Sequence, residues 1–259
     1  MNAPPPLPSA PTGATANLGH ALGGIARLSL RQVFTSNQAI ITLVLAALFG
    51  VLTALVVNPG DFDRYAGWLV QPYLTILLPI FAFMSGANAM REDMKSGTVD
   101  YILTRPVPRP WVVLGRFAVH VAGMQVVYLA VFAVLAGVGV FRQVPDLGAI
   151  LAPLLVAQIM AVVAFQALGF FCGSLTSRYL VVGIVYAGIV ENGLGRIPLQ
   201  INRLSILHHL RSLAPSLGEP APDRLLALGY LVLITAVLVT ASAALFTIKE
   251  FAGEQSRET

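Results

Sequence analysis

Six long apolar stretches recur along this chain, and their length constrains its fold more than any other feature. A helix needs roughly 20 apolar residues to cross a bilayer core about 30 Å thick, because lipid offers no hydrogen-bond partner to an exposed peptide group. The chain is therefore predicted to be all-α, a polytopic membrane protein with six transmembrane helices. The predicted spans are Ala39–Val57, Leu69–Met90, Phe117–Val140, Ala149–Cys172, Tyr179–Gly195 and Leu225–Ile248.

Composition separates this chain from soluble enzymes. Of its 259 residues, 56% are hydrophobic and 11% are charged, whereas a soluble domain carries about 25% charged residues. The single cysteine, Cys172, excludes an internal disulfide and a cysteine-rich metal site. The basic residues are scattered rather than clustered, so nucleic acid is not an expected partner.

The segments that flank the spans divide the chain further. Residues 1–17 are rich in proline and uncharged, and they are predicted to form a disordered cytoplasmic tail. Residues 18–37 are predicted to form an amphipathic interfacial helix, with a simple extension of the first span as the alternative. Residues 38–248 form the predicted six-span domain, and residues 249–259 form a cytoplasmic C-terminal tail.

The distribution of positive charge predicts the orientation. An even number of spans places both termini on one side, and Lys and Arg are enriched in cytoplasmic segments. With cytoplasmic termini, ten Lys and Arg residues lie inside and six outside. We therefore expect a multi-pass protein of the plasma (cytoplasmic) membrane with both termini in the cytoplasm. Residues 196–224 supply four of the six outer arginines, and their spaced Leu and Ile residues predict short helices on the outer rim, either external or partly re-entrant.

Residue patterns that catalysis requires are missing. A phosphate-binding loop for ATP ends in Gly-Lys, and neither Lys95 nor Lys249 follows a glycine. His208 and His209 are adjacent, so they project about 100° apart on a helix and do not form a zinc pair. We interpret them as polar residues of an exposed amphipathic helix. No catalytic residue and no metal site is expected.

A few polar residues interrupt the spans. An intramembrane serine enzyme would use Ser85 or Ser174 together with His120. No glycine-framed nucleophile motif surrounds either serine. Ser85 lies among small residues, which are typical of close helix packing. Glu191 is the one acid close to a span, so it either ends that span at the interface or lines a substrate path. An ion-gradient-driven secondary transporter or channel is therefore an alternative function. The possible translocation-path residues are Asn88, Gln166, Glu191 and Asn192.

The longest strongly charged run lies between the second and third predicted spans. It extends from Arg91 to Arg116 and contains five basic and three acidic residues. Gly97 can end the incoming helix, and Thr98 can cap a new one. Three prolines that begin at Pro106 prevent that new helix from continuing. The run predicts a short cytoplasmic helix over Val99–Thr104, whereas an ordinary positive loop in contact with anionic lipid is the alternative.

This run resembles the cytoplasmic coupling segment of the type-2 ATP-binding-cassette (ABC) exporter permeases. In that family an acid precedes Gly-Thr, followed by a second acid, apolar residues, proline, arginine, and glycine with a basic residue. The departures are mild: Pro108 stands where serine is common, and Arg116 stands where lysine is common. The residues that carry the resemblance are Glu92, Gly97, Thr98, Asp100, Ile102, Leu103, Pro106, Pro108, Arg109, Gly115 and Arg116.

The resemblance implies a function and partners. Such a chain works as a non-hydrolytic permease subunit, paired with a second, identical or related permease and with two cytosolic ABC ATPase subunits that bind ATP and Mg²⁺. The short helix docks in a groove of the ATPase, and this chain binds no cofactor itself. The residues expected to couple the permease to the ATPase are Glu92, Asp93, Gly97, Thr98, Asp100, Arg105, Pro106, Arg109, Gly115 and Arg116.

Overall fold

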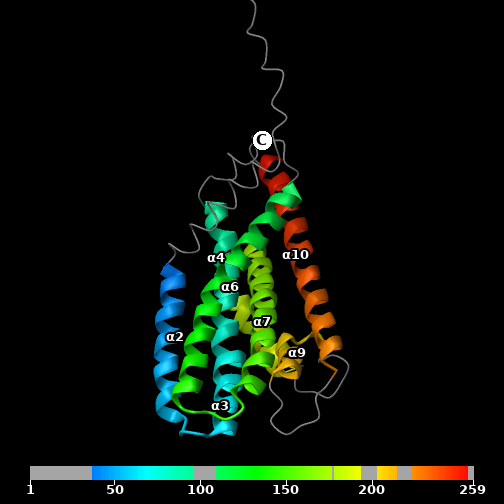
Figure 1. The fold of residues 1–259 in the computed structure, drawn as a ribbon. Coiled ribbons are helices and arrows are strands. Elements are labelled where there is room, and N and C mark those ends of the chain that lie inside the picture. The colour runs from blue at the N-terminus through cyan, green and yellow to red at the C-terminus, as the bar shows by residue number, and fades with distance from the viewer. Residues whose placement is uncertain (1–36, 96–108, 177, 194–202, 215–222, 256–259) are drawn as a thin grey trace, which may run out of the picture.

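The computed structural model describes residues 37–95, 109–176, 178–193, 203–214 and 223–255, and every regular element in these ranges is a helix (Figure 1). The predicted all-α fold class is therefore confirmed. The predicted interfacial helix and the predicted short helix over Val99–Thr104 lie outside the described residues. The elements are α2 (Asn37–Val56), α3 (Phe62–Trp68), η1 (Leu69–Leu77), α4 (Leu78–Lys95), α6 (Arg109–Phe141), α7 (Leu147–Leu175), α8 (Tyr179–Tyr186), η2 (Ala187–Gly193), α9 (Ile206–Leu213) and α10 (Arg224–Gln255), where η marks a π-helix.

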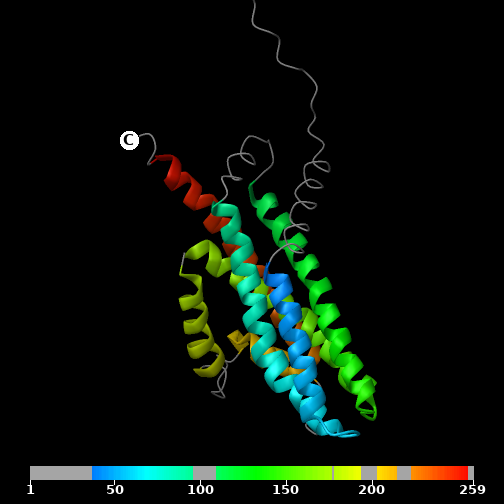
Figure 2. The ribbon, with the colours of Figure 1, turned by 90° about the vertical axis from the view of Figure 1, so that its left-hand side faces the viewer.

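Five helical stretches are long and apolar enough to cross a membrane. They account for five of the six predicted spans. The remaining one, α8 with η2, has eight and seven residues, which makes it about 22 Å long and shorter than a bilayer core. Figure 2 shows this short element running beside the bundle from the end of α7 towards α9. The five long stretches are Ala39–Val56, Phe62–Arg91, Val113–Phe141, Leu147–Leu175 and Arg224–Phe246.

The helices alternate in direction between the two ends of the bundle. The end of α4 at Lys95, the start of α6 at Arg109 and the end of α10 lie towards one end (Figure 1), which we call the coupling end. The α3 helix, the turn between α6 and α7, and α9 lie towards the opposite end. The described chain starts and finishes at the coupling end, as an even number of passes requires.

The α4 and α7 helices make the most extensive contact in the described part of the molecule. Glycines allow their backbones to touch. A Cβ atom added at Gly86 of α4 would lie 2.2 Å from the carbonyl oxygen of Gln166, and one added at Gly169 of α7 would lie 2.0 Å from the carbonyl oxygen of Phe83. Gly169 and Gly173 lie four residues apart on α7, which is the small-residue spacing typical of close helix contacts in membranes. The predicted close packing around Ser85 is confirmed.

Hydrogen bonds satisfy several polar side chains within the bundle. The hydroxyl of Tyr73 donates to the Gln158 side-chain carbonyl, and the Gln158 amide donates to the Tyr128 carbonyl oxygen at 3.0 Å. Tyr65 donates its hydroxyl to the Leu135 carbonyl oxygen at 2.7 Å. Because a polar group without a partner is costly in lipid, these bonds help to join η1 to α7, α7 to α6, and α3 to α6.

The contact between α4 and α7 predicts that one added methyl group lowers the stability of the bundle. In Gly169→Ala the new Cβ atom would collide with the Phe83 backbone, so we expect a loss of about 1–3 kcal/mol of stability. The melting temperature in detergent, followed by size-exclusion chromatography of heated samples, measures this loss.

The matched control is Gly137→Ala within α6, where an added Cβ atom has nothing within 4 Å. Alanine has the higher helix propensity, so the control should be neutral or stabilising by up to about 1 kcal/mol. Equal melting temperatures for the two variants would contradict the proposed role of the backbone contact.

Candidate functional site

The predicted coupling residues flank a single end of the bundle. Glu92 and Asp93 lie in the last turn of α4, while Arg109 is the first residue of α6. Gly115 and Arg116 lie in the second turn of α6, and Arg116 is half-buried. The structure therefore brings both ends of the charged run together at the coupling end (Figures 1 and 2). The others, Gly97, Thr98, Asp100, Arg105 and Pro106, lie outside the described residues.

A small apolar cluster fastens the two flanking helices to the rest of the coupling end. It joins Met90 of α4, Val113 of α6, Phe170 of α7 and Ala243 of α10, all of which are buried. The ring of Phe117, half-buried beside this cluster, meets the ring of Phe170 edge to face with centroids 5.6 Å apart. The α4 and α6 helices, which flank the charged run, are thus both packed against α7.

A hydrogen bond also joins the two flanking helices. The Ser85 hydroxyl of α4 lies 2.9 Å from Nε2 of His120 in α6. This is the pair considered for an intramembrane serine enzyme, and the structure brings it together. Ser85 is only 1% exposed, so its hydroxyl is closed to substrate in this conformation. The contact joins α4 and α6, the two helices that flank the charged run.

Further polar contacts connect the end of α4 with the start of α8. Tyr179 donates its hydroxyl to the Asn88 side-chain carbonyl at 2.7 Å. The Arg91 guanidinium donates to the carbonyl oxygen of Thr176 at 3.3 Å, and it lies 5.8 Å from the centre of the Tyr179 ring. Thr176 is the C-cap residue that follows α7. The end of α4 is therefore linked to α7 and α8 as well as to α6.

Glu191 binds the start of α9. Its carboxylate accepts hydrogen bonds from the Tyr186 hydroxyl at 2.8 Å and from the Ser205 hydroxyl at 2.5 Å. It also accepts the backbone N–H groups of Ile206 and Leu207, both at 3.0 Å. A buried carboxylate at a helix N-terminus satisfies free N–H groups and complements the helix dipole. These bonds support the structural interpretation of Glu191, which is 5% exposed.

The α9 helix is less exposed than its sequence suggested. His209 is 4% exposed, and its Nε2 atom lies 2.8 Å from the Arg203 carbonyl oxygen. Its ring stacks on Tyr230 of α10 with centroids 4.9 Å apart. The expectation that both histidines are exposed was therefore wrong for His209, because α10 covers that face of the helix. Partial burial, together with the nearby His209 and Arg211, lowers the pKa of His208, which favours a neutral imidazole at neutral pH.

The residues proposed for a translocation path do not converge on one surface. Gln166 is fully buried in α7, and neither atom of its side-chain amide has a hydrogen-bond partner among the described residues. Asn88 is half-buried at the coupling end, whereas Glu191 and Asn192 belong to η2. The role of these four residues in a path stays a prediction.

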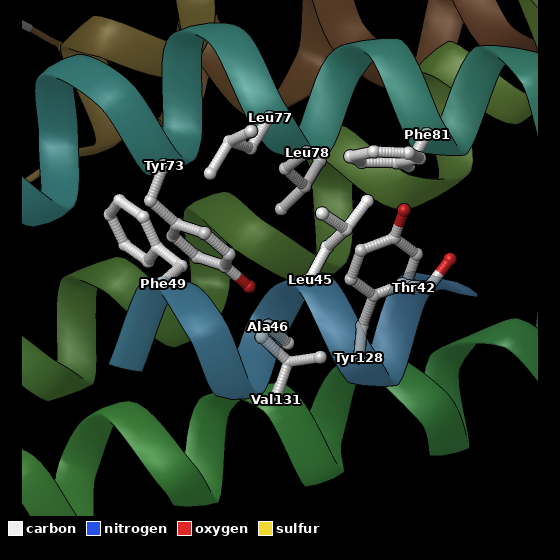
Figure 3. Close-up of a pocket in the computed structure, with 10 residues that line it drawn as sticks. All are labelled: Thr42, Leu45, Ala46, Phe49, Tyr73, Leu77, Leu78, Phe81, Tyr128 and Val131. Carbon is white, nitrogen blue, oxygen red and sulfur yellow. The ribbon is translucent and has the colours of Figure 1, made fainter. Parts of the chain in front are cut away.

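A small cavity lies between α2, the continuous helix of η1 and α4, and α6 (Figure 3). Thr42 and Phe49 of α2, Tyr73 of η1 and Tyr128 of α6 are among the residues that line it. Its volume of about 20 Å³ is enough for roughly one water molecule. The Tyr128 hydroxyl is buried and has no hydrogen-bond partner within the described ranges.

Comparison with known proteins identifies the family. Residues 23–191 match the family described as ABC-2 family transporter protein, which is more than half of the chain. The chain belongs to the ABC-2 transporter family. The resemblance of the charged run to the type-2 ABC permeases is confirmed. This ABC-2 chain is a multi-pass membrane permease. No curated protein matches the chain by sequence.

The sequence of this ABC-2 chain did not reveal the contacts that the residues beside the charged run make with other helices. Arg91 was interpreted only as part of the charged run, and Tyr179 only as the first residue of a span. The available signal was the spacing of Ser85, Asn88 and Arg91, which are three residues apart and so lie near one another along α4. That spacing identifies neighbours on one helix, but it does not identify their partners on other helices.

The bonds of Glu191 predict the effect of removing its charge. Glu191→Gln replaces one acceptor oxygen with an NH₂ group that faces hydrogen-bond donors, so at least one charged hydrogen bond is lost. We expect the stability to fall by about 1.5–3 kcal/mol. The melting temperature of the purified chain in detergent reports this change.

Asp223→Asn is the matched control, because Asp223 is exposed next to the start of α10. This variant should melt at the same temperature as the parent chain. A Glu191→Gln chain as stable as the parent, but with altered transport, would favour the substrate-path role of Glu191.

Proposed function

We propose that this chain is the membrane-spanning permease subunit of an ABC exporter that takes its energy from a separate ATPase. The family match over residues 23–191 is the observation that carries this proposal. In this scheme ATP and Mg²⁺ bind to the partner ATPase, and this chain forms the path for the transported molecule. The chain does not hydrolyse ATP itself, since neither of its two lysines follows a glycine.

Coupling is proposed to run through the segment from Glu92 to Arg116. What supports this is the position of the two ends of the segment, which belong to α4 and α6. Both helices are held against α7 by the Met90, Val113 and Phe170 cluster. A force applied to the segment would therefore reach three spans together. Closure of the ATPase dimer would apply that force and switch the path between inward-facing and outward-facing states.

The assembly is proposed to contain two permease chains, identical or related, and two ATPase subunits. The coupling end faces the cytoplasm of a plasma-membrane protein in this proposal, because the ATPase and its ATP are cytosolic. The positive residues support this orientation, with ten on the cytoplasmic side against six outside.

The acids at the end of α4 test the coupling proposal. Charge reversal in a Glu92→Lys, Asp93→Lys chain would place like charges against the basic partners expected in the ATPase groove, which costs several kcal/mol at an interface. We expect the amount of co-purified ATPase to fall at least about tenfold, with unchanged membrane insertion. Affinity purification from native membranes measures both quantities.

The control for this experiment reverses charges at the opposite end. Asp63→Lys and Asp223→Lys change exposed acids in α3 and directly before the start of α10. These changes should leave the ATPase content unaltered. An unchanged ATPase content in the Glu92→Lys, Asp93→Lys chain would remove both acids from the mechanism.

Accessibility labelling tests the proposed orientation. In a Cys172→Ala background, Leu204→Cys introduces a thiol at a position that is 62% exposed, close to α9. A membrane-impermeant maleimide should label it on intact cells. Arg178→Cys, an exposed position near the coupling end, should react only after the membrane is permeabilised. The reverse pattern would place the coupling segment outside the cell and end the exporter proposal.

A further inference from the structure

Three side chains connect the last turns of α4 with the start of α8. Asn88 accepts the Tyr179 hydroxyl at 2.7 Å, and Arg91 covers the Tyr179 ring while it donates to the carbonyl oxygen of Thr176. We call Asn88, Arg91 and Tyr179 the α4–α8 latch. Tyr179 is bound through both its hydroxyl and its ring face, so its position follows the position of α4.

Between its two ends, α8 packs on the bundle through half-buried side chains, among them Val182 and Tyr186. None of its residues is buried, and Ile184 is 72% exposed. Close contact is made with Phe83 of α4, whose ring lies 6.4 Å from that of Tyr179 and whose atoms are within 2.5 Å of a Cβ built on Gly183. At its other end the short span is bound through Glu191 to α9. The span is thus fixed by hydrogen bonds at both ends, and the residues between them are half-buried or exposed.

The helices on the other side of the latch behave as one unit. The α4 backbone touches α7 at Gly86 and Gly169, and such direct backbone contact leaves little room for the two helices to slide. Arg91 reaches the C-cap residue of α7, and α8 begins only a few residues later in the sequence. A displacement of the α4–α7 pair at the coupling end therefore acts directly on the first turn of α8.

We propose that the α4–α8 latch transmits movement of the coupling segment to the short fifth span. Asn88, Arg91 and Tyr179 are positioning residues in this mechanism, since they act by making α8 follow α4. The inference rests on the proposed coupling of this chain to an ATPase. It gives Asn88 a function in movement of the spans rather than in contact with the transported molecule.

The test uses the complex purified with its ATPase from native membranes. Cys172 is the chain's single cysteine, so a Cys172→Ala background carries one introduced cysteine at a time. Ile184→Cys places a spin label on α8, and Ala118→Cys places one on an exposed position of α6 beside the coupling segment. The readout is the change in spin-label mobility between the nucleotide-free complex and the complex trapped with ATP and vanadate.

Tyr179→Phe removes the hydroxyl that Asn88 accepts and keeps the ring. Arg91→Lys keeps the positive charge and removes the planar guanidinium, and it serves as the second variant. For both variants we expect the response at position 184 to fall at least about threefold, the factor that an average interhelical hydrogen bond contributes in a membrane. The response at position 118 and the ATPase content should stay at the parent level.

Tyr186→Phe is the matched control, because it removes a hydroxyl from the same helix at the end bound to Glu191. Its response at position 184 should equal that of the parent. A full response at position 184 in both latch variants overturns the inference, as does a parent complex that responds at position 118 but not at position 184. Absence of a response at both positions, or of any co-purified ATPase, overturns the proposed function itself.

Discussion

Direct backbone contact between α4 and α7 is the interaction on which the other helix positions depend. Helices in a bilayer gain little by leaving lipid for one another, so they associate through close van der Waals contact and internal hydrogen bonds. Gly86 and Gly169 allow that contact. Because α4 leads into the charged run and α7 leads into the turn before α8, this pair links the coupling end to every later element of the chain.

Polar side chains then determine how the remaining elements attach to this pair. In hydrocarbon a polar group needs a protein partner, and the chain supplies these partners both within the bundle and towards helix ends. At the coupling end Ser85 bonds with His120 of α6, and Asn88 bonds with Tyr179 of α8. At the opposite end Glu191 binds the first N–H groups of α9. The short span α8 is consequently hydrogen-bonded at its two ends, to α4 at one and through Glu191 to α9 at the other.

The structure places the described coupling residues at one end of the bundle, and their role in coupling stays a prediction. The turn residues and charges between Glu92 and Arg116 were sufficient to identify the family, because that signal lies within a short stretch of sequence. The latch behind the segment was not predictable, since the Asn88–Tyr179 bond joins residues 91 positions apart. The exposure of His209 was mispredicted for a related reason: an amphipathic pattern shows that one face is apolar, but it does not show that Tyr230 covers the histidine beside it.

The sequence by itself determined the all-α class, the positions of the long spans and the lack of a phosphate-binding loop. These properties depend on local hydropathy and local motifs, and both are set by residues that are close together in the sequence. Tertiary structure alone decided that no residue of α8 is buried, that Glu191 binds the start of α9, and which side chains meet at the coupling end. Those outcomes depend on how closely distant helices approach, and that distance is decided by packing of the whole bundle.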